Sequence, residues 1–119
     1  MNMNEKQTLK EKIQFITSHM TRGDIQNLLQ FYFETEETPE AIVINRGNSH
    51  VEGFMKLSRR IFKFEIIFLE NNNKAILWIK LKHGRSVIEK KIQVEFKEQE
   101  NEIMIYQAND KMYLFSVYF

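Results

Sequence analysis

The sequence predicts an α+β roll in which three N-terminal helices pack on a curved, mostly antiparallel sheet. Two observations lead to this fold class. Apolar residues recur every three or four positions in the first half of the chain, and every second position from Phe62 onward. Turn residues then divide the second half into about five strands, as in a meander. A length of 119 residues with 43% hydrophobic content fits one domain with a single core.

Two short amphipathic helices are expected first. The positions that define them are Leu9, Ile13, Ile16 and Met20, followed by Ile25, Leu28, Leu29, Tyr32 and Phe33. Residues 21–24 separate the two helices. We expect Gly23 to end the first helix in the left-handed conformation, and Asp24 to cap the second.

A third helix is predicted over residues 49–61, after a short strand at 41–44. Ser49 and Glu52 have the spacing of a capping box, in which each side chain satisfies a free backbone N–H group. The residues that then fall on one helical face are Val51, Phe54, Met55, Ser58 and Ile61.

Strand register follows from two predicted turns, at residues 71–72 and 84–85. The resulting pairs include Phe68 with Ala75, Leu81 with Ile88, Ile79 with Lys90, and Trp78 with Lys91. On the other face the same register pairs Lys80 with Glu89 and Lys74 with Glu95, so apolar residues match on one face and opposite charges match on the other. The Trp78 indole and the Lys91 ammonium are expected to form a cation–π contact.

Two polar residues on the predicted inner face, Lys90 and Gln107, indicate a ligand pocket. A buried ammonium is costly unless it is paired, so Lys90 either lines a wet cavity or lies at a bulge or at the sheet rim, where it extends into solvent. In the first case we expect the pocket to lie beside the first and third helices. Its walls then include Phe64, Ile79 and Ile92.

The predicted outer face is unusually apolar. Its large outward residues include Ile76, Trp78, Met104, Tyr106, Tyr113 and Phe115. Monomers seldom leave such a patch in water, so we expect a cover, most simply a second copy of the chain. The competing interpretation is that the two faces of the last strand have been exchanged.

Composition and motifs exclude several classes of protein. The chain lacks cysteine, its three histidines are scattered, and its four glycines are isolated, so we predict no metal and no cofactor. The net charge is +1, although residues 56–91 hold ten basic and three acidic side chains. This basic stripe is either a solvated surface or a phosphate-binding one. Because no signal peptide or membrane span is evident, we expect a cytoplasmic protein.

The order of elements resembles the nuclear-transport-factor-two-like superfamily, which includes ketosteroid isomerase and SnoaL-like cyclases. Thr21-Arg22-Gly23-Asp24 looks like the family's junction between the first two helices, and Arg46-Gly47 looks like its glycine before the third helix. The resemblance covers nearly the whole chain. It implies one cone-shaped domain over residues 1–119, a deep pocket between sheet and helices, and homodimers packed through the sheet.

Three functions are compatible with these expectations. The leading one is a non-catalytic homodimer whose pocket binds a small apolar ligand, or whose surface binds a protein partner. The alternative is a SnoaL-like isomerase or dehydratase: the resemblance places Glu40 near the family's acidic base, with Lys90 as electrostatic stabiliser, but Ile16 stands where the family has a tyrosine. The third is a nucleic-acid-binding module that uses the basic stripe.

Overall fold

The structure of the protein is a computed structural model that describes residues 8–119. Two helices come first, α1 (Leu9–His19) and α2 (Arg22–Tyr32). The strands are β1 (Ala41–Arg46), β2 (His50–Leu57), β3 (Arg60–Asn71), β4 (Lys74–His83), β5 (Ser86–Gln99), β6 (Glu102–Gln107) and β7 (Tyr113–Tyr118). The prediction of three N-terminal helices on a sheet is therefore wrong, because the described residues form mainly a sheet with two short helices.

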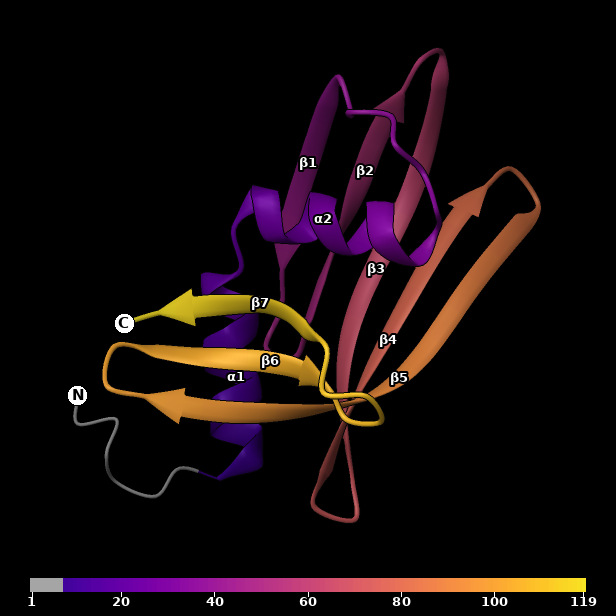
Figure 1. The fold of residues 1–119 in the computed structure, drawn as a ribbon. Coiled ribbons are helices and arrows are strands. Elements are labelled where there is room, and N and C mark those ends of the chain that lie inside the picture. Colours follow the sequence, from indigo (N-terminus) through magenta and orange to yellow (C-terminus); the bar gives the residue numbers. More distant parts are fainter. Residues whose placement is uncertain (1–7) are drawn as a thin grey trace.

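The seven strands form one antiparallel sheet in which each strand pairs with the next along the chain. The sheet curls into a half-barrel. Figure 1 shows that the long strand β5 bends midway, so that β6 and β7 run across the direction of β1 to β4. The helices and the strands share one core, to which α1, its C-cap residue and α2 contribute Ile13, Ile16, Met20, Ile25, Leu28 and Leu29.

The region predicted as the third helix forms β2 and its turn into β3. Side chains of β2 alternate between core and surface, and Val51, Met55 and Leu57 are buried. β2 pairs with β1 on one side and β3 on the other, which satisfies its backbone groups along both edges. Gly53 is required there, because an added Cβ would collide with the carbonyl oxygen of Val43. The apolar residues of this region fit both a helical period and a strand period. Pairing with β1 and β3 decides in favour of the strand.

The junction between the helices differs from the expected one at Gly23. Thr21 is the N-cap of α2: its hydroxyl accepts a hydrogen bond from the Asp24 N–H at 3.1 Å, and the Asp24 carboxylate accepts one from the Thr21 N–H at 2.9 Å. Gly23 therefore lies in the first turn of α2, and its φ is not positive. Asp24 acts as the second half of a capping box and is not the cap itself.

The C-terminus of α1 is held by Arg46 at the end of β1. The two guanidinium nitrogens Nη1 and Nη2 donate to the carbonyls of Thr17 at 2.8 Å and Met20 at 2.6 Å. A cation at the carbonyl end of a helix also complements the helix dipole. Arg46 and Gly47 thus belong to the end of a hairpin, and their expected place before a third helix is wrong.

Strand register was predicted correctly at one hairpin and missed by two residues at another. The β4–β5 pairs are confirmed, including Ile79 with Lys90 and Trp78 with Lys91. The predicted cation–π contact is also confirmed, with the Lys91 Nζ 4.3 Å from the ring centroid of Trp78. In β3–β4, however, Phe68 faces Leu77 in place of Ala75. The turn uses Asn72 and Asn73, both at positive φ, and a shift of two residues leaves every side chain on its predicted face.

Candidate functional site

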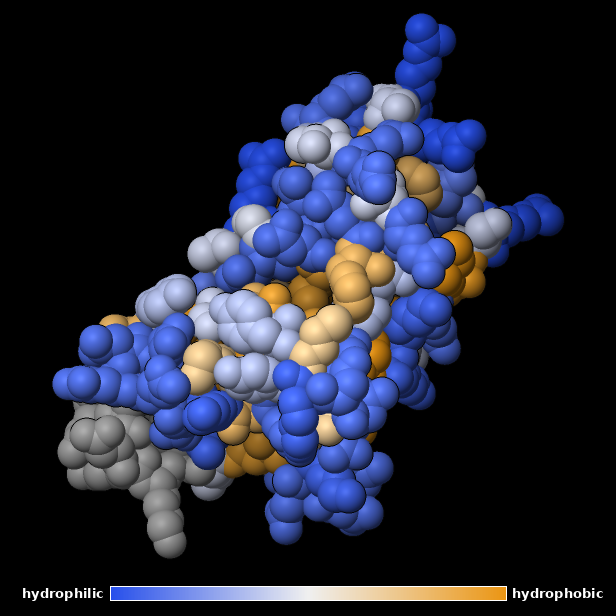
Figure 2. Space-filling model, in the orientation of Figure 1, coloured by the Kyte–Doolittle hydropathy of each residue, from blue (hydrophilic) through white to orange (hydrophobic). Residues whose placement is uncertain are grey.

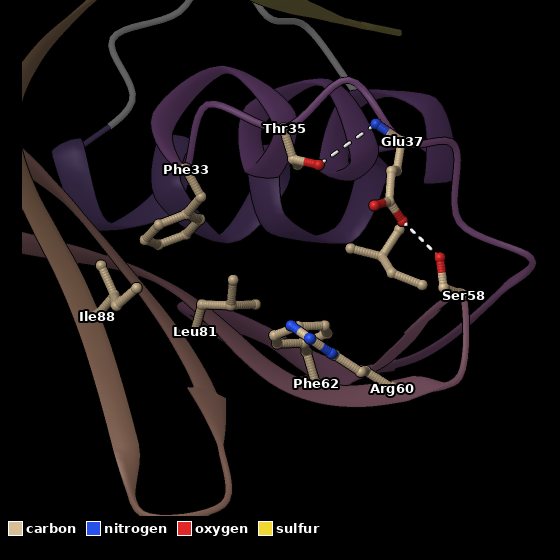
Figure 3. A pocket seen from close by; sticks show the side chains of 9 residues that line it. Phe33, Thr35, Glu37, Ser58, Arg60, Phe62, Leu81 and Ile88 are labelled. Atoms are coloured by element: carbon tan, nitrogen blue, oxygen red, sulfur yellow. Dashed lines mark hydrogen bonds between the residues drawn. The ribbon is translucent and has the colours of Figure 1, made fainter.

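A cavity of about 410 Å³ lies between the segment after α2 and the strands β2 to β5. We call it the mouth pocket. Figure 3 shows side chains from these different elements surrounding it. Its lining residues are Phe33, Thr35, Glu37, Leu57, Ser58, Arg60, Phe62, Leu81 and Ile88. A pocket of this size suits a small organic molecule.

The walls of the mouth pocket are mainly apolar. Leu57 and Leu81 are buried and connect the pocket to the core, while Phe33 and Phe62 are half-buried. Ile88 pairs with Leu81 across the sheet but leaves 54% of its surface exposed. The half-barrel therefore keeps an accessible apolar surface inside a concave site.

The polar side of the mouth pocket is ordered by hydrogen bonds around Glu37. The Ser58 hydroxyl donates to the Glu37 carboxylate at 3.0 Å. The backbone of Glu37 is also fixed, because its N–H donates to the Thr35 hydroxyl at 3.3 Å and its carbonyl accepts from the Gln30 amide at 2.9 Å. The Glu37 carboxylate is thus held at the pocket by the segment that follows α2.

Arg60 brings the opposite charge to the same pocket. It is the first residue of β3 and is exposed. Within residues 8–119, no salt bridge joins Arg60 to Glu37 or to any other acidic side chain. Both charges therefore remain available to a molecule that enters the pocket.

The structure places the residues of the predicted pocket in different surroundings. Phe64 and Ile79 are fully buried in the core. Ile92 and Gln107 share a separate surface depression of about 430 Å³. Lys90 is exposed on β5, as expected for a lysine that extends into solvent, and it does not line that depression. Because residues 49–61 form no helix, the expected boundary of the pocket is also missing.

Gln107 forms part of an internal hydrogen-bond cluster that we call the Tyr32 cluster (Tyr32, Gln107 and Asp110). The Tyr32 hydroxyl donates to the Gln107 side-chain oxygen at 2.6 Å, and the Gln107 amide donates to the Asp110 carboxylate at 3.0 Å. Burial and the nearby Asp110 charge raise the pKa of Tyr32 to about 12. The hydrogen bonds from Gln107 and from the Met112 backbone lower the pKa of Asp110.

The proposed catalytic pair does not come together. Glu40 is exposed before β1, and its carboxylate lies 3.4 Å from the Lys56 Nζ. Lys90 lies on β5, and β2, β3 and β4 stand between β1 and β5 in the sheet. The pairing with Lys56 makes Glu40 one member of a surface ion pair.

The residues of the predicted interface divide into three groups. Phe115 points inward and is only 4% exposed, so its outward placement is wrong; an irregularity between Ile105 and Tyr106 shifts the register with β7. Met104, Tyr106 and Tyr113 form an outward cluster, with the Tyr106 and Tyr113 rings 5.7 Å apart. On β4, Ile76 and Trp78 are half-buried. Lys80 and Lys91 both lie over the Trp78 ring.

The sequence predicts Arg60 only as a member of the basic stripe and not as a pocket residue, and it does not single out Glu37. Glu37 lies in the acidic stretch 34–40, and Arg60 follows a two-residue turn that begins at Ser58, whose φ is positive. If residues 50–71 are interpreted as a β-hairpin, this turn lies at one end of the two paired strands. The contact between that turn and the segment after α2 has no local sequence signal.

Over residues 8–119, no group of three or more histidine, cysteine or acidic side chains is placed to hold a metal ion. None of the helices in the same range is long and apolar enough to cross a membrane. On the side shown in Figure 2, hydrophilic residues dominate and hydrophobic ones gather near the middle. A groove of about 230 Å³ between α2 and the start of β7 includes Phe31.

No protein-family model, curated protein or solved structure matches the chain. The resemblance to the nuclear-transport-factor-two-like superfamily therefore stays a prediction. Function is inferred from the site itself, because a fold alone does not determine function.

Proposed function

We propose that this protein is a non-catalytic binding protein whose mouth pocket takes a small apolar ligand. The observation that carries the proposal is an accessible apolar wall within a concave site. Ile88 is more than half exposed, although its side chain lines the cavity beside the buried Leu81. A ligand that covers this wall removes apolar surface from water, which favours binding by roughly 25 cal/mol per Å².

The proposal assigns no catalytic role, because the catalytic pair considered from the sequence does not meet in the mouth pocket. General acid–base catalysis requires a titratable group within hydrogen-bond reach of the reacting atoms. Glu37 is the acidic group in the pocket, and its carboxylate accepts from the Ser58 hydroxyl. The pair considered from the sequence, Glu40 and Lys90, is separated by the intervening strands. Binding therefore accounts for the pocket with fewer requirements than catalysis.

A titration with 1-hexanol, followed by nuclear magnetic resonance, tests the proposal. We expect backbone signals around the mouth pocket to shift, with a dissociation constant in the millimolar range for so small a probe. Ile88→Glu should weaken binding about tenfold, because it places a charge on the apolar wall. Val87→Glu is the matched control, since Val87 is 52% exposed and alternates onto the other face of β5. Equal effects of the two substitutions, or shifts only at other sites, contradict the proposal.

Association of two copies through the outer sheet face remains a separate prediction. Ile67 and Trp78 pair on adjacent strands, next to the pair of Leu69 and Ile76. The Lys80 and Lys91 ammonium groups over Trp78 must move aside, or find acidic partners, before a second copy can pack there. Sedimentation at micromolar concentration should give a wild-type dimer and a folded Trp78→Glu monomer. A wild-type monomer would contradict the prediction.

A further inference from the structure

The mouth pocket combines two charged residues near the β2–β3 turn with an apolar wall that includes Phe33, Leu81 and Ile88. Glu37 is held by Ser58, and Arg60 follows Ser58 by two residues around the β2–β3 turn. Figure 3 shows Glu37 beside Ser58, the Arg60 side chain below them in front of Phe62, and Phe33 and Ile88 on the opposite side of the view. The pocket is thus amphipathic, with an acidic and a basic group at the same end.

These opposite charges do not neutralise each other. The distance between the Glu37 carboxylate and the Arg60 guanidinium exceeds that of a salt bridge, although both groups line one cavity. The hydroxyl of Ser58 donates to one carboxylate oxygen of Glu37, which leaves the other oxygen able to accept. A guanidinium presents several N–H donors in a planar fork that matches a carboxylate.

We infer that the ligand of the mouth pocket is a zwitterion with an apolar body, in which an ammonium and a carboxylate sit together at one end. This inference rests on the proposed function of the pocket. The ligand ammonium donates to Glu37, its carboxylate accepts from Arg60, and its apolar body covers Phe33, Leu81 and Ile88. A free α-amino acid with an apolar side chain has this distribution of charge.

Ligands with a single charge fit the same site less well. A carboxylate without an ammonium gains the attraction of Arg60 but is repelled by Glu37. An alkylammonium gains the attraction of Glu37 but is repelled by Arg60. A neutral apolar molecule uses the wall and leaves both charges hydrated. Charge pairs at exposed sites are individually weak, so each matched group is expected to change affinity by about threefold to tenfold.

Probes that share a six-carbon body test the inference. They are 1-hexanol, hexanoate, hexylammonium, norleucine, which carries both charges at one end, and 6-aminohexanoate, which carries them at opposite ends. Binding to the full chain is measured by nuclear magnetic resonance titration. We expect norleucine to bind more tightly than hexanoate, hexylammonium and 6-aminohexanoate.

Charge-removing variants assign the two contacts. Arg60→Met should weaken norleucine and hexanoate by about threefold to tenfold and leave 1-hexanol unchanged. Glu37→Gln should weaken norleucine and hexylammonium in the same way. Arg59→Met and Glu36→Gln are the matched controls, since these neighbours change the net charge equally without lining the pocket. Both controls should leave norleucine affinity within about twofold of the wild type.

The outcomes separate this inference from the proposed function. If 1-hexanol binds at the mouth pocket but norleucine binds no more tightly than the singly charged probes, the zwitterion inference is overturned and apolar binding stands. If Arg60→Met and Arg59→Met change norleucine affinity equally, the inference is also overturned. If no probe shifts signals at the mouth pocket, the proposed function itself fails.

Discussion

Two polar regions of this half-barrel use their side chains in opposite ways. In the Tyr32 cluster, Gln107 accepts from the Tyr32 hydroxyl and donates to the Asp110 carboxylate, so its hydrogen-bonding groups are used within the chain. In the mouth pocket, Glu37 and Arg60 face a shared cavity without pairing. The comparison teaches that a polar residue within an apolar region indicates a ligand only when the chain leaves some of its donors or acceptors unused, as at Arg60 and at the second carboxylate oxygen of Glu37.

The largest effect on stability is expected at Gln107. Gln107→Leu removes the acceptor of the half-buried Tyr32 hydroxyl and the donor to Asp110. We expect a loss of about 1–2 kcal/mol in the free energy of unfolding, measured by urea denaturation. Gln93→Leu is the matched control, because Gln93 is exposed on β5, and it should change stability by less than about 0.5 kcal/mol. Equal losses from the two substitutions would mean that the Tyr32 cluster contributes nothing specific.

Local sequence signals predicted α1, α2 and the β4–β5 ladder, but they also predicted a third helix that does not form and missed the position of the site. The Gly84 turn and the match of Lys80 with Glu89 select one register, and the structure has that register. At β2, Val51 and Met55 satisfy both a helical and a strand period, so only pairing with β1 and β3 decides. Local patterns were sufficient for the β4–β5 hairpin, whereas at the β3–β4 hairpin they gave the faces of the strands but not the register.

The mouth pocket could not be predicted, because it depends on contacts between segments distant in the chain. Glu37 reaches Ser58 across 21 positions of the chain.

The Tyr32 cluster depends on a distant contact as well, since Tyr32 reaches Gln107 across 75 positions. The polarity of Gln107 on an apolar face is visible in the sequence. Its acceptor role toward Tyr32 becomes visible only when α2 is placed against the end of β6. Periodicity assigns a face to a residue, but it does not identify the partners of that residue.

The pH dependence of stability tests the Tyr32 cluster. Burial and then the Asp110 charge raise the pKa of Tyr32 from 10.0 to about 12. Below the unfolded value, both states hold the proton and the contribution of Tyr32 is fully present. Between pH 10 and about 12 the unfolded state loses its proton first, so stability falls as pH rises.

Urea denaturation at about pH 9 and about pH 11 measures this loss. Tyr32→Phe should be less stable than the wild type at the lower pH, and the difference should shrink at the higher pH. The ultraviolet absorbance of tyrosinate provides a second measurement, in which Tyr32→Phe removes a component that titrates late. The Glu102 charge raises the pKa of Tyr118 as well, so Tyr118 gives a second late component of the absorbance titration. Tyr118→Phe removes that component alone, and comparison of the two variants assigns each component to its tyrosine. A stability difference that is independent of pH would contradict the assignment to Tyr32.

The smallest effect on stability is expected at Arg60, and the small size is itself informative. Its side chain is exposed and makes no salt bridge within residues 8–119, so Arg60→Met removes no internal contact of that kind. We expect the free energy of unfolding to change by less than about 0.5 kcal/mol, measured beside Gln107→Leu under the same conditions. A loss as large as that of Gln107→Leu would mean that Arg60 serves the fold. A near-zero change together with weaker norleucine binding would mean that its charge is held for a ligand.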